Sequence, residues 1–426
     1  MNIREEARRM KLAAPKLAAM TNEERNRALK EVALSLEEKK AEIFAANEED
    51  LLQARQNKIS DAVYKRLKFD EGKLKSVIDG IDQLISLPDP VGKVQLFRQM
   101  DEDLILKRIS CPIGVIGVIF EARPDALVQI SSLCIKSGNC ALLKGGKETA
   151  RTNRILFKTI YDSVVKAGLP EGCLVQAELH NEIDELLQCE KDVDLLIPRG
   201  SNRFVQYIMN NTKIPVMGHA DGICHIYVDK DADLSEALPV IIDAKTQYTA
   251  ACNAVETVLI HRDLADDFLP MLKEELEKNQ VRIRGTREVA DRIGCEVMEE
   301  EEFDTEYLEL VISLKLVKNA VEAVEHINFF GSHHTDAILT QNQETAEYFM
   351  QMVDSAGVYQ NCSTRFADGF RYGFGAEVGI STSKIHARGP VGLEGLMTYK
   401  YRIYGHGQIV GDYAEGRKEF HFKDLQ

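Results

Sequence analysis

One cysteine of this chain has a setting that suits a nucleophile. Cys252 lies in residues 247–257, Gln-Tyr-Thr-Ala-Ala-Cys-Asn-Ala-Val-Glu-Thr, between a helical pattern and the apolar run 258–260. The small and polar residues before it predict a tight turn into the start of a strand. A thiolate there could attack an acyl carbon, and backbone amides could hold the resulting oxyanion. The alternative for Cys252 is a buried structural thiol, the commonest fate of a free cysteine.

The composition limits the classes of protein to consider. The chain has 426 residues, 44% hydrophobic and 28% charged, which is typical of a soluble globular protein with more than one domain. Its 53 Lys and Arg against 68 Asp and Glu give a net charge of −15, which argues against broad binding to nucleic acid or anionic membranes. The nine cysteines form no Cys-x-x-Cys motif, and no signal or membrane-spanning run is present, so we expect a cytoplasmic protein with reduced thiols.

The spacing of apolar residues indicates how the chain is organised. Residues 1–90 have helical spacing, with a capping box at 21–24, and residues 94–109 partly alternate around an Asp-Glu-Asp turn, which predicts a hairpin or an extended arm. Strands and helices then alternate, which predicts an α/β fold with two parallel α/β domains. We expect strands at 113–120, 140–143, 193–197, 223–228 and 257–261, helices at 125–137, 148–167, 231–246 and 263–278, and strands again in the tail, 396–413.

Two of the expected strands end in basic, glycine-rich turns. These turns are residues 144–147, Lys-Gly-Gly-Lys, and residues 198–201, Pro-Arg-Gly-Ser. Ligands of open parallel sheets bind at the carboxyl ends of the strands, where helix N-termini can hold phosphates. Two such turns favour a phosphate-bearing ligand, and a dinucleotide is the natural candidate. The alternative is a pair of ordinary turns with solvated basic side chains.

Two further patterns are weaker. Residues 373–379, Gly-Phe-Gly-Ala-Glu-Val-Gly, have one residue too many for GxGxxG and no helical pattern after them, so they do not predict a dinucleotide loop, although they could approach a substrate. The histidines within 219–225 and at 333–334 superficially resemble metal ligands. No cysteine or carboxylate completes a zinc spacing with them, so no metal is expected.

Five longer motifs run in order through nearly the whole chain. They are 119–125 (Ile-Phe-Glu-Ala-Arg-Pro-Asp), 214–225, 252–257, 331–338 and 389–396. Together they resemble the γ-glutamyl phosphate reductases, or glutamate-5-semialdehyde dehydrogenases, a branch of the aldehyde dehydrogenase superfamily. The resemblance implies NADPH-dependent reduction of L-glutamyl 5-phosphate to L-glutamate 5-semialdehyde and phosphate, in proline biosynthesis. It also implies a homo-oligomer, and it makes the upstream glutamate kinase a candidate partner.

The resemblance further implies three parts and a set of site residues. The parts are an NADP-binding domain (1–95 and 112–226), a catalytic domain (227–395), and an oligomerisation arm and tail (96–111 and 396–426). Cys252 matches the nucleophile. Five residues match cofactor-binding positions. The adenosine ribose or its 2′-phosphate is assigned to Lys144 and Gly145, the pyrophosphate to Gly200 and Ser201, and the nicotinamide ribose to Glu306. Arg123, Arg199, His219, Lys384 and Arg388 are the candidates for binding the substrate's phosphate or carboxylate.

Two departures from the wider superfamily concern the chemistry. Hydrolytic aldehyde dehydrogenases carry Glu-Leu-Gly-Gly, whose glutamate activates water, whereas residues 218–222 here are Gly-His-Ala-Asp-Gly. An enzyme that passes a thioester between hydride and phosphate should not activate water, so this change is expected. The usual oxyanion-binding asparagine is apparently replaced by Ala122, which leaves the Cys252 amide, with Asn253 as a candidate second donor.

Three other functions stay open at this stage. An acylating aldehyde dehydrogenase that uses a CoA thioester would also lack the water-activating glutamate. A non-redox cysteine acyltransferase or thiol hydrolase would need a histidine base near Cys252, and would leave the two glycine-rich turns unexplained. A non-catalytic nucleotide-binding module would leave Cys252 without a role.

Overall fold

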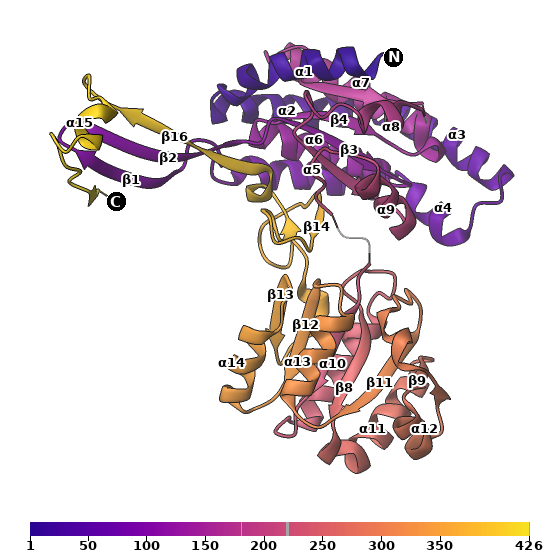
Figure 1. Ribbon diagram of the computed structural model, residues 1–426. Coiled ribbons are helices and arrows are strands. Elements are labelled where there is room, and N and C mark those ends of the chain that lie inside the picture. Colours follow the sequence, from indigo (N-terminus) through magenta and orange to yellow (C-terminus); the bar gives the residue numbers. More distant parts are fainter. Residues whose placement is uncertain (180, 219–220, 426) are drawn as a thin grey trace. The chain divides into compact units, whose positions relative to one another are not determined.

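The computed structural model describes residues 1–179, 181–218 and 221–425, and the chain divides into two compact units (Figure 1). Unit 1 comprises Met1–Met217, Phe374–Gly379 and Val391–Gln426. Unit 2 comprises Gly218–Gly373 and Ile380–Pro390. No helix in the described part of the chain is long and apolar enough to cross a membrane.

Unit 1 begins with the helices that the apolar spacing predicted. The Thr21 side chain accepts a hydrogen bond from the Glu24 amide, and the Glu24 carboxylate accepts one from the Thr21 amide, so the expected capping box starts the second helix. The five helices are α1 (Ile3–Ala18), α2 (Asn22–Glu38), α3 (Lys40–Gln56), α4 (Asp61–Leu67) and α5 (Glu71–Ser86).

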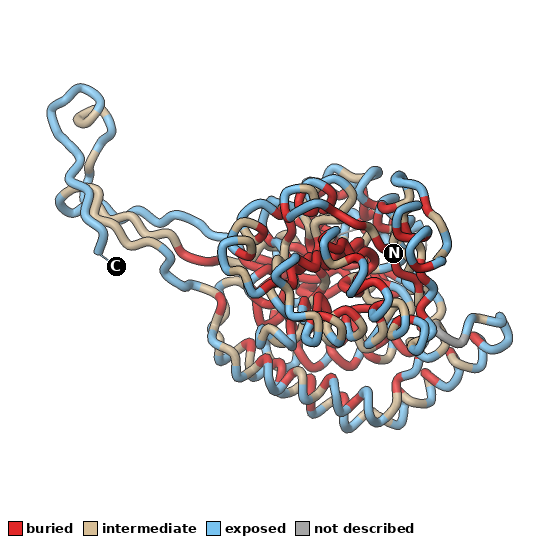
Figure 2. The backbone as a smooth tube through the Cα atoms, turned by 90° about the horizontal axis from the view of Figure 1, so that it is seen from below, coloured by how far each residue is buried: buried red, intermediate tan, exposed pale blue. Residues whose placement is uncertain are grey.

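A parallel sheet with strand order β5-β4-β3-β6 forms the core of unit 1. All residues of β3 are buried, as expected for a wholly apolar run in a parallel sheet. Figure 2 shows the buried residues gathered in the interior of the folded part and the exposed ones around it. The strands are β3 (Val115–Phe120), β4 (Cys140–Lys144), β5 (Leu174–Ala177) and β6 (Leu195–Arg199). The connecting helices are α6 (Pro124–Ser137), η1 (Lys147–Thr149), α7 (Ala150–Lys166), α8 (Asn181–Leu186) and α9 (Asn202–Asn210).

The expected hairpin is part of an antiparallel sheet with strand order β16-β2-β1-β17. Its strands are β1 (Val94–Asp101), β2 (Leu104–Pro112), β16 (Met397–Tyr404) and β17 (Lys423–Asp424). Figure 2 shows this sheet mostly half-buried or exposed. The strand prediction for the tail is wrong beyond Tyr404, because a turn at 405–407, where Gly407 has φ +90°, ends β16 and the short helix α15 (Val410–Ala414) follows.

Unit 2 is built on a parallel sheet with strand order β10-β9-β11-β8-β7-β12-β13. Strands β7 and β8 are wholly buried, with α10, α11 and α12 packed on one face and α13 and α14 on the other. The strands are β7 (Cys224–Val228), β8 (Val255–His261), β9 (Arg282–Gly285), β10 (Glu296–Val297), β11 (Val311–Val317), β12 (Thr335–Leu339) and β13 (Gly357–Gln360). The helices are α10 (Leu234–Thr246), η2 (Arg262–Leu264), α11 (Ala265–Lys278), α12 (Arg287–Ile293), η3 (Glu300–Asp304), α13 (Ala320–Phe330), α14 (Gln343–Met352) and η4 (Thr364–Phe366). The segments β14 (Gly379–Ser381) and β15 (Gly389–Val391) pair with each other, and η5 (Glu394–Leu396) leads into β16.

Candidate active site

Cys252 lies in the predicted tight turn before a strand. The Ala254 amide donates to the Ala251 carbonyl at 2.9 Å, and β8 begins one residue later. A Cβ atom at Gly222 would lie 2.1 Å from the Cys252 carbonyl oxygen, so only glycine lets the two backbones approach this closely. The thiol is half-buried. The Gly222 backbone therefore packs against the Cys252 turn, while the Cys252 thiol stays partly accessible.

A histidine that the sequence suggested only as a metal ligand and as part of a motif contacts the nucleophile. His334 is buried, and its Nε2 lies 3.2 Å from the Cys252 Sγ. Its Nδ1 lies 2.9 Å from the Thr335 hydroxyl. Cys252 and His334 each come just before a strand, β8 and β12, and these strands flank β7 in one parallel sheet, so both residues lie at its amino-terminal edge. The sequence analysis weighed His334 only as a metal ligand, because the topology that brings it to Cys252 leaves no local signal.

A buried carboxylate supports this edge of the sheet. One Asp336 oxygen accepts a hydrogen bond from the His225 amide at 2.7 Å, and the other accepts one from the Ser355 hydroxyl at 2.5 Å. The same carboxylate lies 3.2 Å from the His225 Nδ1. Strands β7 and β12 are thereby tied together directly behind His334, which fixes the strand that carries the histidine.

Both polar atoms of the Asn253 side chain form hydrogen bonds with other residues of the protein. Its amide group donates to the Ala367 carbonyl at 2.8 Å, and its carbonyl oxygen accepts from Arg365. The Asn253 main-chain carbonyl accepts from the Thr364 hydroxyl at 2.7 Å. These contacts fasten the Cys252 turn to the segment around η4.

Arg365 is a second residue that the sequence analysis missed. It is 8% exposed, and its Nε donates to the Gln247 side-chain carbonyl at 3.0 Å while Nη1 donates to Asn253. Burial and the nearby Arg371 charge lower the pKa of the guanidinium, and Cys252 acts in the opposite direction. Arg365 therefore spans the loop that carries the nucleophile. No motif was recognised around residue 365, so its charge gave no signal in the sequence.

A buried ion pair lies on the other side of the same loop. Lys245 of α10 and Glu256 of β8 are 0% and 1% exposed, and their Nζ and Oε2 atoms are 2.5 Å apart. Burial lowers the pKa of Lys245 and raises that of Glu256 to about 7. The second Glu256 oxygen accepts from the Leu308 amide at 3.3 Å. The pair thus anchors the segment that contains Glu306, which is half-buried and raises the pKa of both Lys245 and Glu256.

Two of the expected substrate-binding cations share one carboxylate. Lys384 and Arg388 contact the Asp354 carboxylate at 2.5 and 3.1 Å. The Asp354 carbonyl oxygen lies 2.7 Å from the Nδ1 of His333, the residue before the histidine that contacts Cys252. The structure therefore brings both cations to the chain segment beside the nucleophile, although each has a counter-ion. His219, another expected substrate residue, lies outside the described residues.

The other expected residues lie at one edge of the unit 1 sheet. Lys144, Arg199 and Phe120 end adjacent parallel strands. Lys144 is buried, which lowers its pKa, and its Nζ donates to the Gly145 carbonyl at 2.6 Å. Arg123 is exposed at the start of α6, and Gly200 and Ser201 are exposed at the start of α9.

Two glycines at this edge have no room for a side chain. A Cβ at Gly145 would lie 2.2 Å from the Asn153 Nδ2, and one at Gly200 would lie 2.7 Å from a Glu121 carboxylate oxygen. Burial raises the pKa of Glu121, whose carboxylate also accepts from the Ser201 amide. Glycine at these two positions therefore lets the Asn153 and Glu121 side chains pack against the backbone at the edge where α9 begins.

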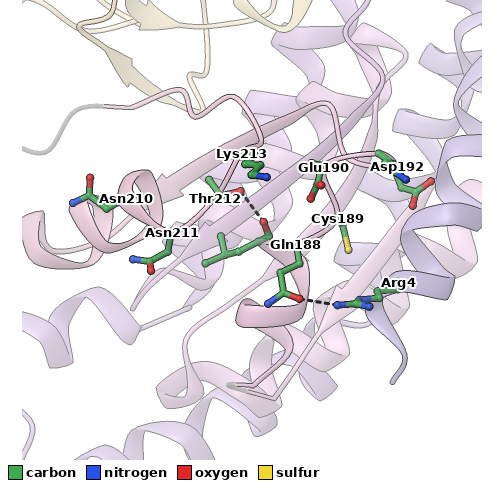
Figure 3. Close-up of a pocket in the computed structure, with 11 residues that line it drawn as sticks. Arg4, Gln188, Cys189, Glu190, Asp192, Asn210, Asn211, Thr212 and Lys213 are labelled. Atoms are coloured by element: carbon green, nitrogen blue, oxygen red, sulfur yellow. Dashed lines mark hydrogen bonds between the residues drawn. The ribbon is translucent and has the colours of Figure 1, made fainter.

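A surface pocket of 640 Å³ lies elsewhere in unit 1. Figure 3 shows its polar lining, where Arg4 donates to the Gln188 side chain at 2.7 Å and the Thr212 hydroxyl donates to the Leu187 carbonyl at 2.8 Å. Residues 187–192 precede β6 and residues 210–213 lie at and after the end of α9, so the pocket is at the opposite edge of the sheet from the expected cofactor residues.

Among the described residues, no three His, Cys, Asp or Glu side chains gather as metal ligands would.

The chain and its fold belong to a known class of protein. Residues 1–301 match the model of the aldehyde dehydrogenase family, so the chain is a member of that family and an oxidoreductase that uses a nicotinamide cofactor. Solved structures of more distant members share the fold alone, for example an acetylating aldehyde dehydrogenase from Geobacillus thermoglucosidasius, which is 17% identical with a TM-score of 0.64 over 96% of this chain and 97% of that one. The expected aldehyde-dehydrogenase-like α/β fold is confirmed.

Closer relatives define the branch within this family. A γ-glutamyl phosphate reductase of Acetivibrio thermocellus is 54% identical over 420 residues, 99% of this chain and 97% of the relative. γ-Glutamyl phosphate reductase 1 of Synechocystis is 53% identical over 97% of this chain and 96% of its own length. The crystal structure of γ-glutamyl phosphate reductase from Thermotoga maritima, 38% identical, matches with a TM-score of 0.94 over 96% of this chain and all of that one. The chain belongs to the γ-glutamyl phosphate reductases.

Proposed function

We propose that this chain reduces L-glutamyl 5-phosphate to L-glutamate 5-semialdehyde and phosphate, with NADPH as the reductant, in proline biosynthesis. The observation that carries the proposal is the contact between Cys252 and His334 in a tight turn of a chain from the γ-glutamyl phosphate reductase branch. A cysteine nucleophile with a buried histidine beside it suits acyl transfer from an activated acid.

In the first half of the reaction, the Cys252 sulfur attacks the C5 carbon of the acyl phosphate. His334 Nε2, at 3.2 Å, is positioned to take the thiol proton as the carbon–sulfur bond forms. The carbon–oxygen bond to phosphate then breaks, and phosphate leaves with the bonding electrons. The turn hydrogen bond uses the Ala254 amide, so the Cys252 amide lies outside it and is the proposed oxyanion donor. Asn253 serves by holding this turn in place.

In the second half, the thioester carbon is reduced and released. When bound, the nicotinamide cofactor supplies the hydride that this carbon accepts. The Cys252 amide holds the oxyanion of the resulting thiohemiacetal. Its collapse breaks the carbon–sulfur bond, returns the electrons to the Cys252 thiolate beside His334, and releases the aldehyde.

The fate of the thioester separates this proposal from a cysteine hydrolase. The Cys252–His334 contact also meets the requirement that such a hydrolase has a histidine near its nucleophile. Residues 218–222 hold no glutamate of the kind that activates water in hydrolytic aldehyde dehydrogenases. We therefore propose that phosphate, rather than water, resolves the thioester in the reverse direction.

The residues present at the edge of the unit 1 sheet fit a dinucleotide. Lys144 ends β4 beside Gly145, and Gly200 and Ser201 are exposed at the start of α9 at the same edge, where helix starts can receive phosphates. We propose that Lys144 and Gly145 hold the adenosine ribose and its 2′-phosphate, that Gly200 and Ser201 hold the pyrophosphate, and that Glu306 holds the nicotinamide ribose. NADPH rather than NADH is proposed because Lys144 offers a cation for the 2′-phosphate.

The three-part organisation is also proposed. In this proposal residues 1–95 and 112–226 form the NADP-binding domain, residues 227–395 the catalytic domain, and residues 96–111 and 396–426 an arm and tail for assembly of a homo-oligomer. The compact units differ from these bounds, because residues 218–226, with the start of β7, lie in unit 2, and residues 374–379 and 391–395 lie in unit 1. Support comes from three tyrosines of β16, Tyr399, Tyr401 and Tyr404, which are 49–56% exposed, as an uncovered interface would be. The candidates for binding the anionic groups of the substrate are Arg123, Arg199, His219, Lys384 and Arg388. We propose the cytoplasm as the location of the protein. Glutamate kinase is the candidate partner.

Trapping the thioester tests the proposed chemistry. The enzyme is mixed with glutamyl phosphate without any cofactor, quenched in acid, and digested for mass spectrometry. We expect a glutamyl adduct on the peptide that contains Cys252, and one equivalent of phosphate released per active site. Cys252→Ala should give neither, while its affinity for NADPH, followed by cofactor fluorescence, stays unchanged. Turnover by Cys252→Ala would contradict the proposal.

A further inference from the structure

The side chain of Arg365 is a buried cation that forms no ion pair or hydrogen bond with a carboxylate of the described residues, although the charges of Asp368 and Asp243 act to raise its pKa. The acceptors of its Nε and Nη1 groups are both neutral amides, those of Gln247 and Asn253. No residue that the structure describes accepts a hydrogen bond from its Nη2, and this atom is not among the fully buried polar atoms that lack a partner. Burying a charge is costly unless an anion or several hydrogen bonds compensate for it. The guanidinium therefore has both charge and donors available for an anion.

Two other buried cations of the chain are compensated within the protein. Arg25, which is fully buried, pairs with the Asp89 carboxylate at 2.7 Å, although its buried Nη1 has no partner. Lys136, also buried, donates to three oxygen atoms, on Asn22, Asn26 and Ile85, which matches its three N–H groups. Arg365 has five N–H donors, and only Nε and Nη1 have acceptors among the described residues. Arg365 differs from Arg25 in two respects: no carboxylate of the described residues pairs with it, and its unused Nη2 is not fully buried, so an anion can reach it.

The position of Arg365 relative to the nucleophile limits what the anion can be. Its Nη1 contacts the residue that follows Cys252, and its charge and that of Cys252 influence each other. In an acyl phosphate, the phosphate is joined through one oxygen to the carbon under attack. The α-carboxylate of a glutamyl group is separated from that carbon by three others. A cation beside the nucleophile is therefore nearer to the phosphate, and arginine matches phosphate oxygens in a bidentate way.

We propose that Arg365 binds the phosphate group at this site, through its Nη2 edge. In the forward direction it stabilises the negative charge on the leaving phosphate as the carbon–oxygen bond breaks. In the reverse direction it holds inorganic phosphate for attack on the Cys252 thioester, whose carbon–sulfur bond breaks as the new carbon–oxygen bond forms. This inference rests on the proposed function and assigns its phosphate subsite.

The reverse reaction isolates this subsite. NADPH formation from glutamate 5-semialdehyde and NADP is followed at varied inorganic phosphate for wild type, Arg365→Gln and Arg365→Lys. The matched control is Arg371→Gln, because Arg371 lies on the same segment, donates to the Arg365 carbonyl and pairs with Asp368. We expect Arg365→Gln to raise the KM for phosphate by roughly 10- to 100-fold, as for loss of a charged hydrogen bond, with the KM for the semialdehyde within about threefold. Arg365→Lys should lie in between, and Arg371→Gln should match wild type.

The outcomes separate the inference from the proposed function. Wild type that turns over without phosphate overturns the proposed function itself. With phosphate dependence intact in wild type, a raised KM for the semialdehyde alone in Arg365→Gln would assign Arg365 to the α-carboxylate and overturn the inference. A fall in kcat with both KM values unchanged would make Arg365 a positioning residue for the Cys252 turn, and would overturn it too.

A second measurement does not depend on turnover. Inorganic phosphate should slow the alkylation of Cys252 by iodoacetamide in wild type, because bound phosphate lies beside the thiol. Arg365→Lys, the variant that best preserves folding, should need roughly tenfold more phosphate for the same protection, since it loses the bidentate contact. Equal protection in both proteins would overturn the inference.

Discussion

Two buried cations lie next to the loop that carries Cys252, and their charges are compensated differently. Lys245 pairs with the Glu256 carboxylate at 2.5 Å, and both side chains are out of contact with water. Among the described residues, the Arg365 guanidinium donates to the neutral amide oxygens of Gln247 and Asn253 and lies over the Tyr248 ring, and no carboxylate pairs with it. A buried cation that pairs with a carboxylate of the protein has a structural role, whereas a buried cation without such a partner can bind an anionic ligand. The loop is thus stabilised by the Lys245–Glu256 ion pair, whereas Arg365 next to it can bind an anion.

The largest expected effect comes from breaking the Lys245–Glu256 pair. Glu256→Gln leaves Lys245 buried without a counter-ion, and we expect the free energy of unfolding to fall by about 3–5 kcal/mol. Replacing both residues, as in Lys245→Met with Glu256→Met, should recover most of that loss. Urea unfolding followed by circular dichroism measures both, since the chain has no tryptophan to report by fluorescence. A double variant as unstable as Glu256→Gln would contradict this account of the pair.

The next effect concerns a buried base in the same unit, His326, whose Nδ1 lies 3.2 Å from the Lys315 Nζ and 3.8 Å from the Glu300 carboxylate. Burial lowers the pKa of His326 to about 2, and its ring packs against Phe303 and Phe330. Because the folded pKa lies below the unfolded value of about 6.5, the stabilising contribution is complete above pH 6.5 and declines as the pH falls toward 2. Each pH unit in that window should cost about 1.4 kcal/mol of unfolding free energy.

The variant His326→Leu tests the origin of that slope. It keeps an apolar side chain in the aromatic cluster and removes the titrating ring, so unfolding free energies between pH 6.5 and 4.5 should become flatter by about 2–3 kcal/mol relative to wild type. His421→Gln is the control, because His421 is exposed in the arm sheet. An unchanged slope in His326→Leu would show that other groups govern the acid sensitivity of unit 2.

A smaller effect is expected from ligand binding at Arg365. Phosphate at ten times its dissociation constant should stabilise wild type by about 1.4 kcal/mol, seen as a rise in melting temperature over sodium chloride at equal ionic strength. Arg365→Gln should lose this rise, whereas the Lys245→Met/Glu256→Met double variant should keep it. A rise that survives in Arg365→Gln would remove the distinction between the two cations.

The smallest effect is expected for a cation of the same segment that solvent reaches. Arg371 is paired with Asp368 at 3.7 Å, and both side chains are about one-third exposed. Arg371→Gln should change the unfolding free energy by less than about 0.5 kcal/mol, because solvent screens such pairs. Thermal unfolding without phosphate measures it. A loss that approaches the one seen for Glu256→Gln would show that charge alone, rather than burial, sets the size of these effects.

The sequence predicted those features that depend on local pattern. The apolar runs gave β3 and β8, the Asp-Glu-Asp turn gave the β1–β2 hairpin, and the small residues before Cys252 gave its turn. The tail beyond Tyr404 was misread, because its β-branched and aromatic residues resemble a strand while the glycine turn at 405–407 ends it.

Long-range contacts were beyond the reach of the sequence. His334 is 82 residues from Cys252 and meets it only because β8 and β12 flank the same strand. Lys384 and Arg388 were chosen for their charge, but a sequence does not reveal that Asp354 is the counter-ion of both. Arg365 was not chosen from the sequence at all. Only the fold shows that no carboxylate among the described residues pairs with it.

The most direct test of the central claim, that phosphate resolves a Cys252 thioester, is a rapid-mixing experiment without phosphate. Enzyme, NADP and glutamate 5-semialdehyde are mixed, and NADPH absorbance is followed before and after phosphate is added. The account predicts a burst of one NADPH per active site, then no further formation until phosphate is present. Continuous formation of NADPH in the absence of phosphate would contradict it, because water would then be resolving the thioester.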